Sequence, residues 1–151
     1  MDEAMPLVRA KKGTQAEVLF RKALRLEPVQ PDLLNNLAQA LELQGLVDDG
    51  LCMGETILIL FPDYLFARAT LATVAMRDGD YEDALELLTP LFAWREFHIS
   101  DYNSLCSAVI EFSLLTQQYH SARTWFDTWS QPDLKNPRLD FCRKLLQKIN
   151  I

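Results

Sequence analysis

The sequence contains an internal repeat whose period is the number of residues from Pro28 to Pro62. This repeat limits the folds that the chain can adopt more than any other feature of the sequence. The same interval separates Gly45 from Gly79. Three longer series with this step place residues of related character in one phase: Ala16, Gly50 and Ala84; Phe20, Gly54 and Leu88; and Ala23, Ile57 and Leu91. A shared phase of this kind predicts stacked supersecondary units that bury a continuous core between neighbours.

The fourth member of each long series comes four residues late. Ala122, Phe126 and Trp129 follow Ala84, Leu88 and Leu91 by the common step plus four residues. Extra residues are tolerated most easily in loops, because the entropy of loop closure grows slowly with length. We therefore expect a lengthened connection between helices around residues 94–100.

Each period contains two stretches with helical spacing of apolar residues. In the first complete period Leu34, Leu37, Ala38 and Leu41 form a stripe, with Asp32 as the expected N-cap. Later helices are expected over 81–88, where Pro90 bends or shortens the helix, over about 100–116 and over 119–130. A closing helix is expected over 136–151, with Asn136 as its cap and Pro137 in its first turn. The pattern predicts an all-α chain.

Three segments resemble the tetratricopeptide repeat, a helix–turn–helix unit of about 34 residues, which is the length of the step found here. AEVLFRKALRLEP at 16–28 is similar to its second helix and closing proline, NNLAQALELQG at 35–45 to its first helix and turn, and GDYEDALELL at 79–88 to its turn and second helix. The resemblance covers roughly residues 13–135 and implies one domain, an α-α superhelix with a capping helix at its C-terminal end. Its expected parts are a partial repeat, 1–30, three repeats, 31–64, 65–98 and 99–135, and a capping helix, 136–151.

The resemblance gives the small residues a steric role and also has exceptions. Ala16, Ala38, Ala72, Ala84 and Ala122 are expected where two helix backbones approach closely. Gly50 and Gly54 stand at a small and a bulky position, and each glycine should weaken its helix by roughly 1 kcal/mol. Ile110 stands where a small residue is usual.

The charge is concentrated in the middle of the chain. The formal net charge is −6, and residues 28–130 hold 4 basic and 15 acidic side chains, while residues 1–27 and 131–151 are mildly basic. This balance argues against a nucleic-acid partner. It is compatible either with solvated helix faces or with a surface that prefers a neutral, apolar or basic partner.

Residues suited to catalysis or metal binding are sparse. The only histidines are His98 and His120, and no phosphate-binding glycine loop or HExxH motif is present. Cys52, Cys106 and Cys142 lie far apart, which argues against a disulfide framework and a zinc site and favours a reducing, cytoplasmic location. We expect no enzymatic activity, no cofactor and no bound metal. No apolar run of roughly 18 residues occurs, so membrane insertion is not expected.

The resemblance implies a partner site instead, since the first helix of each pair lines the concave side of such an array. Amide and hydroxyl side chains there can hydrogen-bond an extended ligand, and Phe66 can receive an apolar side chain. A solvated polar face is the alternative. With Arg77 as the only base, tight binding of an acidic C-terminal peptide is not expected. The candidate residues are Asn35, Asn36, Gln39, Glu42, Phe66, Thr70, Thr73, Arg77, Ser104, Ser107 and Glu111.

An aromatic group forms a second candidate surface. Trp125, Phe126 and Trp129 have helical spacing, which is typical of core residues, whereas an exposed patch would mark a partner surface. Tyr119 belongs to the same region, and Trp94 and Phe97 precede it.

The first hypothesis is a non-catalytic scaffold or adaptor that binds a peptide or protein segment in the concave groove. Alternatives are a small acidic secretion-type chaperone for an exported protein and a regulatory repeat segment of a longer enzyme. The sequence leaves the partner's identity and the oligomeric state open.

Overall fold

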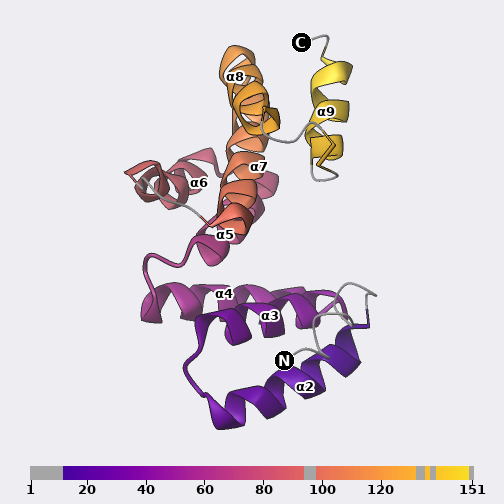
Figure 1. Ribbon diagram of the computed structural model, residues 1–151. Coiled ribbons are helices and arrows are strands. Elements are labelled where there is room, and N and C mark those ends of the chain that lie inside the picture. The colour runs from indigo at the N-terminus through magenta and orange to yellow at the C-terminus, as the bar shows by residue number, and fades with distance from the viewer. Residues whose placement is uncertain (1–11, 94–97, 132–134, 137–138, 150–151) are drawn as a thin grey trace. The chain divides into compact units, whose positions relative to one another are not determined.

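The computed structural model describes residues 12–93, 98–131, 135–136 and 139–149 (Figure 1). Within these residues the secondary structure is helical and contains no strand. The all-α prediction is therefore confirmed. The helices are α2 (Gly13–Leu26), α3 (Pro31–Glu42), α4 (Val47–Leu60), α5 (Leu65–Asp78), α6 (Tyr81–Leu88), the short 3-10 helix η1 (Thr89–Ala93), α7 (Ile99–Leu115), α8 (Tyr119–Ser130) and α9 (Leu139–Lys148).

The starts of the helices follow the period seen in the sequence. α3, α5 and α7 begin one full period apart, at Pro31, Leu65 and Ile99. The interval from the start of α7 to that of α8 is four residues longer than the equal intervals from α3 to α4 and from α5 to α6. The four extra residues therefore lie in α7 and the turn after it, and the prediction of a lengthened connection around 94–100 is wrong. Adding a helical turn keeps the backbone hydrogen-bonded, which an added loop would not do. Residues 94–97 themselves lie outside the described part of the chain.

The three turns that end α3, α5 and α7 share one geometry. Gly45, Gly79 and Gln117 each adopt a positive φ, of 82°, 84° and 60°. In each turn the next amide donates to a carbonyl five residues back, as Leu46 does to Leu41 at 3.0 Å, and the positive-φ amide donates to the carbonyl three residues before it. This is the Schellman motif, which satisfies the last carbonyls of a helix. The turns that the resemblance implies at the end of 35–45 and at the start of 79–88 are confirmed at Gly45 and Gly79.

The start of α3 differs from the predicted cap. α3 begins at Pro31, so Asp32 lies in the first turn and is not the N-cap. Proline suits this position because its missing N–H would have no partner in the first turn. The Asp32 carboxylate instead accepts a hydrogen bond from the Tyr64 hydroxyl at 2.8 Å. The closing helix α9 is described from Leu139 onward, and the Leu139 amide donates to the Asn136 carbonyl at 3.0 Å. Pro137 lies outside the described residues, so the cap at Asn136 stays a prediction.

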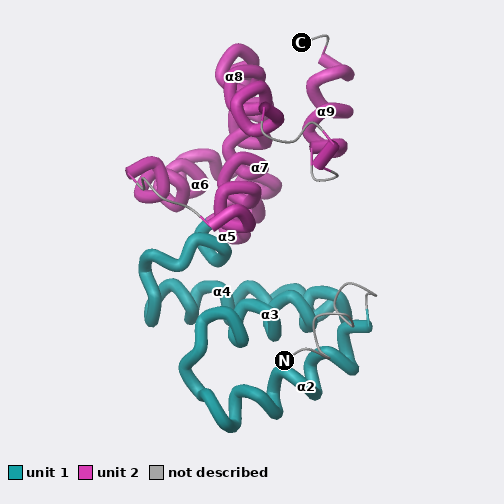
Figure 2. The backbone as a smooth tube through the Cα atoms, in the orientation of Figure 1, with its two compact units in different colours: residues 1–68 teal, residues 69–151 magenta. Residues whose placement is uncertain are grey.

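The chain forms two compact units, residues 1–68 and 69–151, which divide within α5 (Figure 2). In unit 1, α3 packs against both α2 and α4 and runs antiparallel to them (Figure 1). The core of unit 1 is formed by buried residues of α2 and α3, namely Ala16, Phe20, Leu33, Leu37, Ala40 and Leu41.

In unit 2, α7 packs against α8, and α9 contacts both of these helices. Leu139, Cys142 and Leu146 of α9 are buried, whereas Ile149, which follows α9, is exposed. The core of unit 2 consists of Cys106, Ile110, Ala122, Phe126, Trp129, Leu139, Cys142 and Leu146.

The small residues are buried, as close helix packing requires, and a close approach of two helices is seen at Gly50. Ala16, Ala72, Ala84 and Ala122 are fully buried, and Ala38 is nearly so. Gly50 is buried in α4, and a Cβ there would lie 2.8 Å from Glu42 Cγ and 3.2 Å from the Ala38 carbonyl oxygen. The missing side chain allows α4 to approach α3 closely, which offsets the low helix propensity of glycine.

Candidate partner-binding site

The polar face predicted for α3 is only partly exposed. Asn35 is 8% exposed and therefore buried, so it does not belong to an open surface as predicted. Gln39 is exposed, while Asn36 and Glu42 are partly exposed. The side chains of Asn36 and Gln39 have no hydrogen-bond partner among the described residues. These two amides are consequently available to a ligand.

The candidate residues of α5 differ in how freely they are presented. The Phe66 ring is partly buried and lies 5.8 Å from the Tyr64 ring, centroid to centroid. Thr73 donates its hydroxyl to the Ala69 carbonyl at 2.9 Å, within the same helix. Thr70 and Arg77 are exposed. Thr70 and Arg77 are therefore more accessible to a ligand than Thr73, whose hydroxyl is already hydrogen-bonded.

The candidate residues of α7 are largely engaged by the protein itself. Ser104 donates its hydroxyl to the Ser100 carbonyl at 3.1 Å. Burial raises the pKa of the Cys142 thiol of α9, the nearby Ser107 hydroxyl lowers it, and the Glu111 charge raises it further. Burial raises the pKa of Glu111, and attraction to Arg77 opposes this rise. The face of α7 that holds Ser107 and Glu111 is therefore close to the closing helix, a relationship that the helical spacing alone could not show.

The predicted site residues are thus divided. Unit 1 holds the candidate residues of α3 together with Phe66, and unit 2 holds the other α5 residues and those of α7. Within unit 2, Arg77 and Glu111 come close enough for their charges to interact. Gln39 and Asn36 in unit 1 and Thr70 and Arg77 in unit 2 remain the most open of the set.

A cavity in unit 1 was missed by the sequence-based reasoning. Its volume is about 360 Å³, and it lies among α2, α3 and α4. Leu34 and Leu41 of α3 and Met53 of α4 supply apolar walls, and the sequence identified both leucines only as core residues. The complete lining is Arg21, Leu34, Leu41, Asp49, Cys52, Met53 and Thr56.

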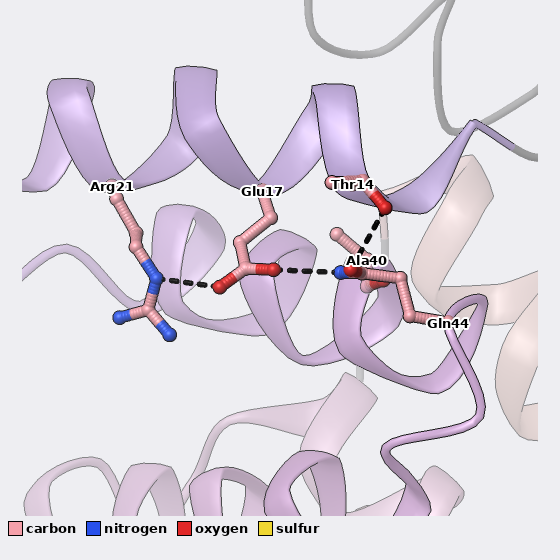
Figure 3. Close-up of polar contacts among 5 residues, drawn as sticks. All are labelled: Thr14, Glu17, Arg21, Ala40 and Gln44. Atoms are coloured by element: carbon pink, nitrogen blue, oxygen red, sulfur yellow. Dashed lines mark hydrogen bonds and ion pairs between the residues drawn. The ribbon is translucent and has the colours of Figure 1, made fainter.

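A polar network joins α2 to the turn after α3 and includes Arg21, which also lines the cavity (Figure 3). Gln44, which follows α3, accepts a hydrogen bond from the Thr14 hydroxyl at 2.9 Å and donates to Glu17 at 2.7 Å. The other oxygen of Glu17 pairs with Arg21 Nε at 2.7 Å. These interactions, with the Gln44 hydrogen bond first, lower the pKa of Glu17. Arg21 therefore reaches the cavity with its charge already paired, whereas Asp49 has no ion-pair partner among the described residues.

The aromatic group is mainly core. Phe126 and Trp129 are buried, at 7% and 4% exposure, which confirms the core interpretation for these two. Trp125 is partly buried, and its ring lies 6.2 Å from that of Phe92. Tyr119 is 37% exposed. Trp94 and Phe97 lie outside the described residues.

Solved structures resemble this arrangement over almost the whole chain. A tetratricopeptide repeat protein from Parabacteroides merdae matches 99% of the chain with a TM-score of 0.60 and 21% identity. The fold is of the tetratricopeptide-repeat type. A MamA RS-1 double mutant matches with a TM-score of 0.57 and 14% identity, over 99% of this chain and 91% of its own. The chain spans 58% of the length of the Parabacteroides protein.

Comparison of the sequence itself gave no match, either to a protein-family model or to a curated protein. The repeat fold is therefore visible through the positions of its helices rather than through overall sequence identity. In the part of the chain that the structure describes, no helix is both long and apolar enough to cross a membrane.

Proposed function

We propose that the chain is a non-catalytic scaffold that binds a peptide or protein segment along the first helices of its repeats. The observation that carries the proposal is the pair of amide side chains on α3, Asn36 and Gln39, which lack partners among the described residues. Each amide can both donate and accept, so together they suit the backbone of an extended segment.

The fold supports the proposal in a second way. α3 and α5 are each the first helix of their period, the helix that carries the partner-binding face in repeats of the tetratricopeptide type. Within unit 2, Thr70 and Arg77 of α5 are exposed polar groups. The residues of α7 contribute less, because Ser107 and Glu111 lie close to α9.

The charge of the site also restricts the partner. Arg77 is the only base among the candidate residues, and it interacts with Glu111. A carboxylate-rich ligand would therefore find little compensation for the loss of its hydration. We propose a neutral or basic segment as the ligand and do not expect tight binding of an acidic C-terminal peptide.

Affinity capture from the native host tests the proposal. The tagged chain should capture a defined protein, and Asn36→Ala/Gln39→Ala should reduce this capture about tenfold, since it removes two hydrogen-bonding groups. Glu55→Ala is the matched control, because Glu55 is an exposed polar residue of α4 outside the proposed face. Equal capture by the parent chain, the Asn36→Ala/Gln39→Ala variant and the Glu55→Ala control would refute the proposed binding face on α3. Failure to capture any protein, even after chemical cross-linking, would refute the scaffold function.

A further inference from the structure

The cavity of unit 1 lies on the side of α3 away from the proposed polar face. Leu34 and Leu41 are two helical turns apart and share one side of the helix. With 3.6 residues per turn, Asn36 and Gln39 point roughly 180° away from the two leucines. A ligand in the cavity and a segment on the polar face would therefore be separate contacts.

The residues that the repeats place at the position of Met53 indicate which kind of group fits the cavity. Met53 lies three residues after Gly50, and the corresponding residues of unit 2 are Leu87, three residues after Ala84, and Trp125, three residues after Ala122. In α8 this position thus carries an indole, which packs on Phe92 and on the buried core. In unit 1 the smaller Met53 leaves a cavity of about 360 Å³ with apolar walls.

The charged residues at the rim of the cavity indicate which charge a ligand should carry there. Arg21 is paired with Glu17 at 2.7 Å, so its charge is compensated. Asp49 is exposed and has no ion-pair partner among the described residues. α4 carries three acidic residues, Asp48, Asp49 and Glu55, and no basic one. The α4 side of the rim is therefore complementary to a cation, whereas the α2 side carries Arg21, Lys22 and Arg25.

We propose that this cavity receives an aromatic side chain of a protein partner, with a lysine or arginine beside it that pairs with Asp49. The proposal rests on the scaffold function and adds a second contact on a different side of α3. The aromatic group would bury its ring against Leu34, Leu41 and Met53, as Trp125 does against its own core, while the cation stays at the wet rim.

A capped pentapeptide, Ala-Lys-Trp-Lys-Ala, is a suitable probe, and Cys52 provides the readout because it lines the cavity and is exposed. Saturating peptide should slow the alkylation of Cys52 by uncharged iodoacetamide, as followed by mass spectrometry of the intact chain. Ala-Lys-Ala-Lys-Ala should bind about tenfold more weakly, since it buries no ring. Ala-Glu-Trp-Glu-Ala should also bind more weakly, because its carboxylates face Asp49.

Two neighbouring residues provide a matched pair of variants. Asp48 and Asp49 are both exposed, but only Asp49 lines the cavity. Asp49→Lys should weaken binding of the lysine–tryptophan peptide about fivefold, and Asp48→Lys should have less effect. Met53→Trp should fill the cavity and abolish protection of Cys52. If Met53→Trp fails to fold, the comparison of Asp49→Lys with Asp48→Lys still tests the proposal.

Chemical shifts of the labelled protein separate failure of this inference from failure of the scaffold function. Changes centred on Leu34, Leu41 and Met53 would support the cavity. Changes centred on Asn36 and Gln39 would overturn the cavity and support the polar face. Equal effects of Asp48→Lys and Asp49→Lys, or no protection of Cys52 by the tryptophan peptide, would overturn the cavity and leave the capture experiment to judge the scaffold function.

Discussion

Trp129 donates its indole N–H to Oδ1 of Asn103 across a distance of 2.7 Å, and so joins α8 to α7 in the interior of unit 2. Both residues are buried, at 4% and 8% exposure. A buried polar pair of this kind stabilises a fold only while both members are present, because either one alone has lost its water.

Removing one member of this pair should therefore be costly. We expect Asn103→Ala to lower the free energy of unfolding by about 2 kcal/mol, since it leaves the indole N–H unpaired and opens space in the core. Trp129→Phe should be similarly destabilising, because it leaves Asn103 unpaired. Denaturant unfolding measures both changes. The double variant should lose less than the sum of the single losses, and strict additivity would contradict a direct coupling.

Gln117 occupies the left-handed position that Gly45 and Gly79 occupy in the other two turns. Its φ of 60° is unfavourable for a residue with a Cβ. We expect Gln117→Gly to stabilise the chain by up to about 1 kcal/mol, because glycine adopts this conformation without strain. Thermal unfolding measures the gain.

The matched control for this substitution is the reverse change in an equivalent turn. Gly79→Ala should destabilise the chain by about 1 kcal/mol, although a Cβ at Gly79 meets nothing within 4 Å. The penalty would then come from the backbone conformation alone. A neutral Gly79→Ala together with a destabilising Gln117→Gly would show that φ does not govern these turns.

Glu111 should make the stability of the chain fall as the pH rises. Burial raises the pKa of this carboxyl above its ordinary value near 4.5, so the folded state binds its proton more tightly than the unfolded state does. Stability from this group is fully present below pH 4.5 and is lost as the pH rises through the raised pKa. Glu111→Gln should therefore unfold at a higher temperature than the parent chain at pH 7, with little difference at pH 4.

Glu17 provides a control of opposite sign. Its pKa is lowered by the Gln44 and Arg21 interactions, so its contribution is present above the ordinary value and is lost as the pH falls through the lowered pKa. Glu17→Gln should lower the unfolding temperature at pH 7 only slightly, because the Arg21 guanidinium is largely exposed. A pH profile in which both variants shift in the same direction would refute the opposite environments of the two carboxyls.

The three cysteines should react in two classes. Cys52 is exposed, whereas Cys106 and Cys142 are buried, and burial raises the pKa of each buried thiol to about 11. When the pKa of a thiol rises from 9.0 to about 11, roughly a hundredfold less thiolate is present at a given pH. The thiolate is the reactive form. We expect one rapidly alkylated thiol per native chain and three after unfolding in denaturant. Rapid reaction of two or three thiols in the native state would contradict the packing of α9.

The period and the local signals in the sequence were enough to predict the helices. Helix α8 begins and ends where the spacing of apolar residues predicted, at Tyr119 and Ser130, and α6 ends at Leu88 just before Pro90. Both predictions depend on interactions between residues close together in the chain, such as helix periodicity and the missing amide of proline.

Contacts between residues far apart in the chain decided the rest. Only the tertiary structure placed α9 near Ser107 and Glu111, buried Asn35, paired Trp129 with Asn103 and left a cavity beside Met53. The same helical spacing is compatible with an open or a covered face, because exposure depends on which helix packs against it. The sequence by itself thus determined an all-helical repeat with defined turns, whereas the packing of one helix on another determined which polar groups remain free to bind a partner.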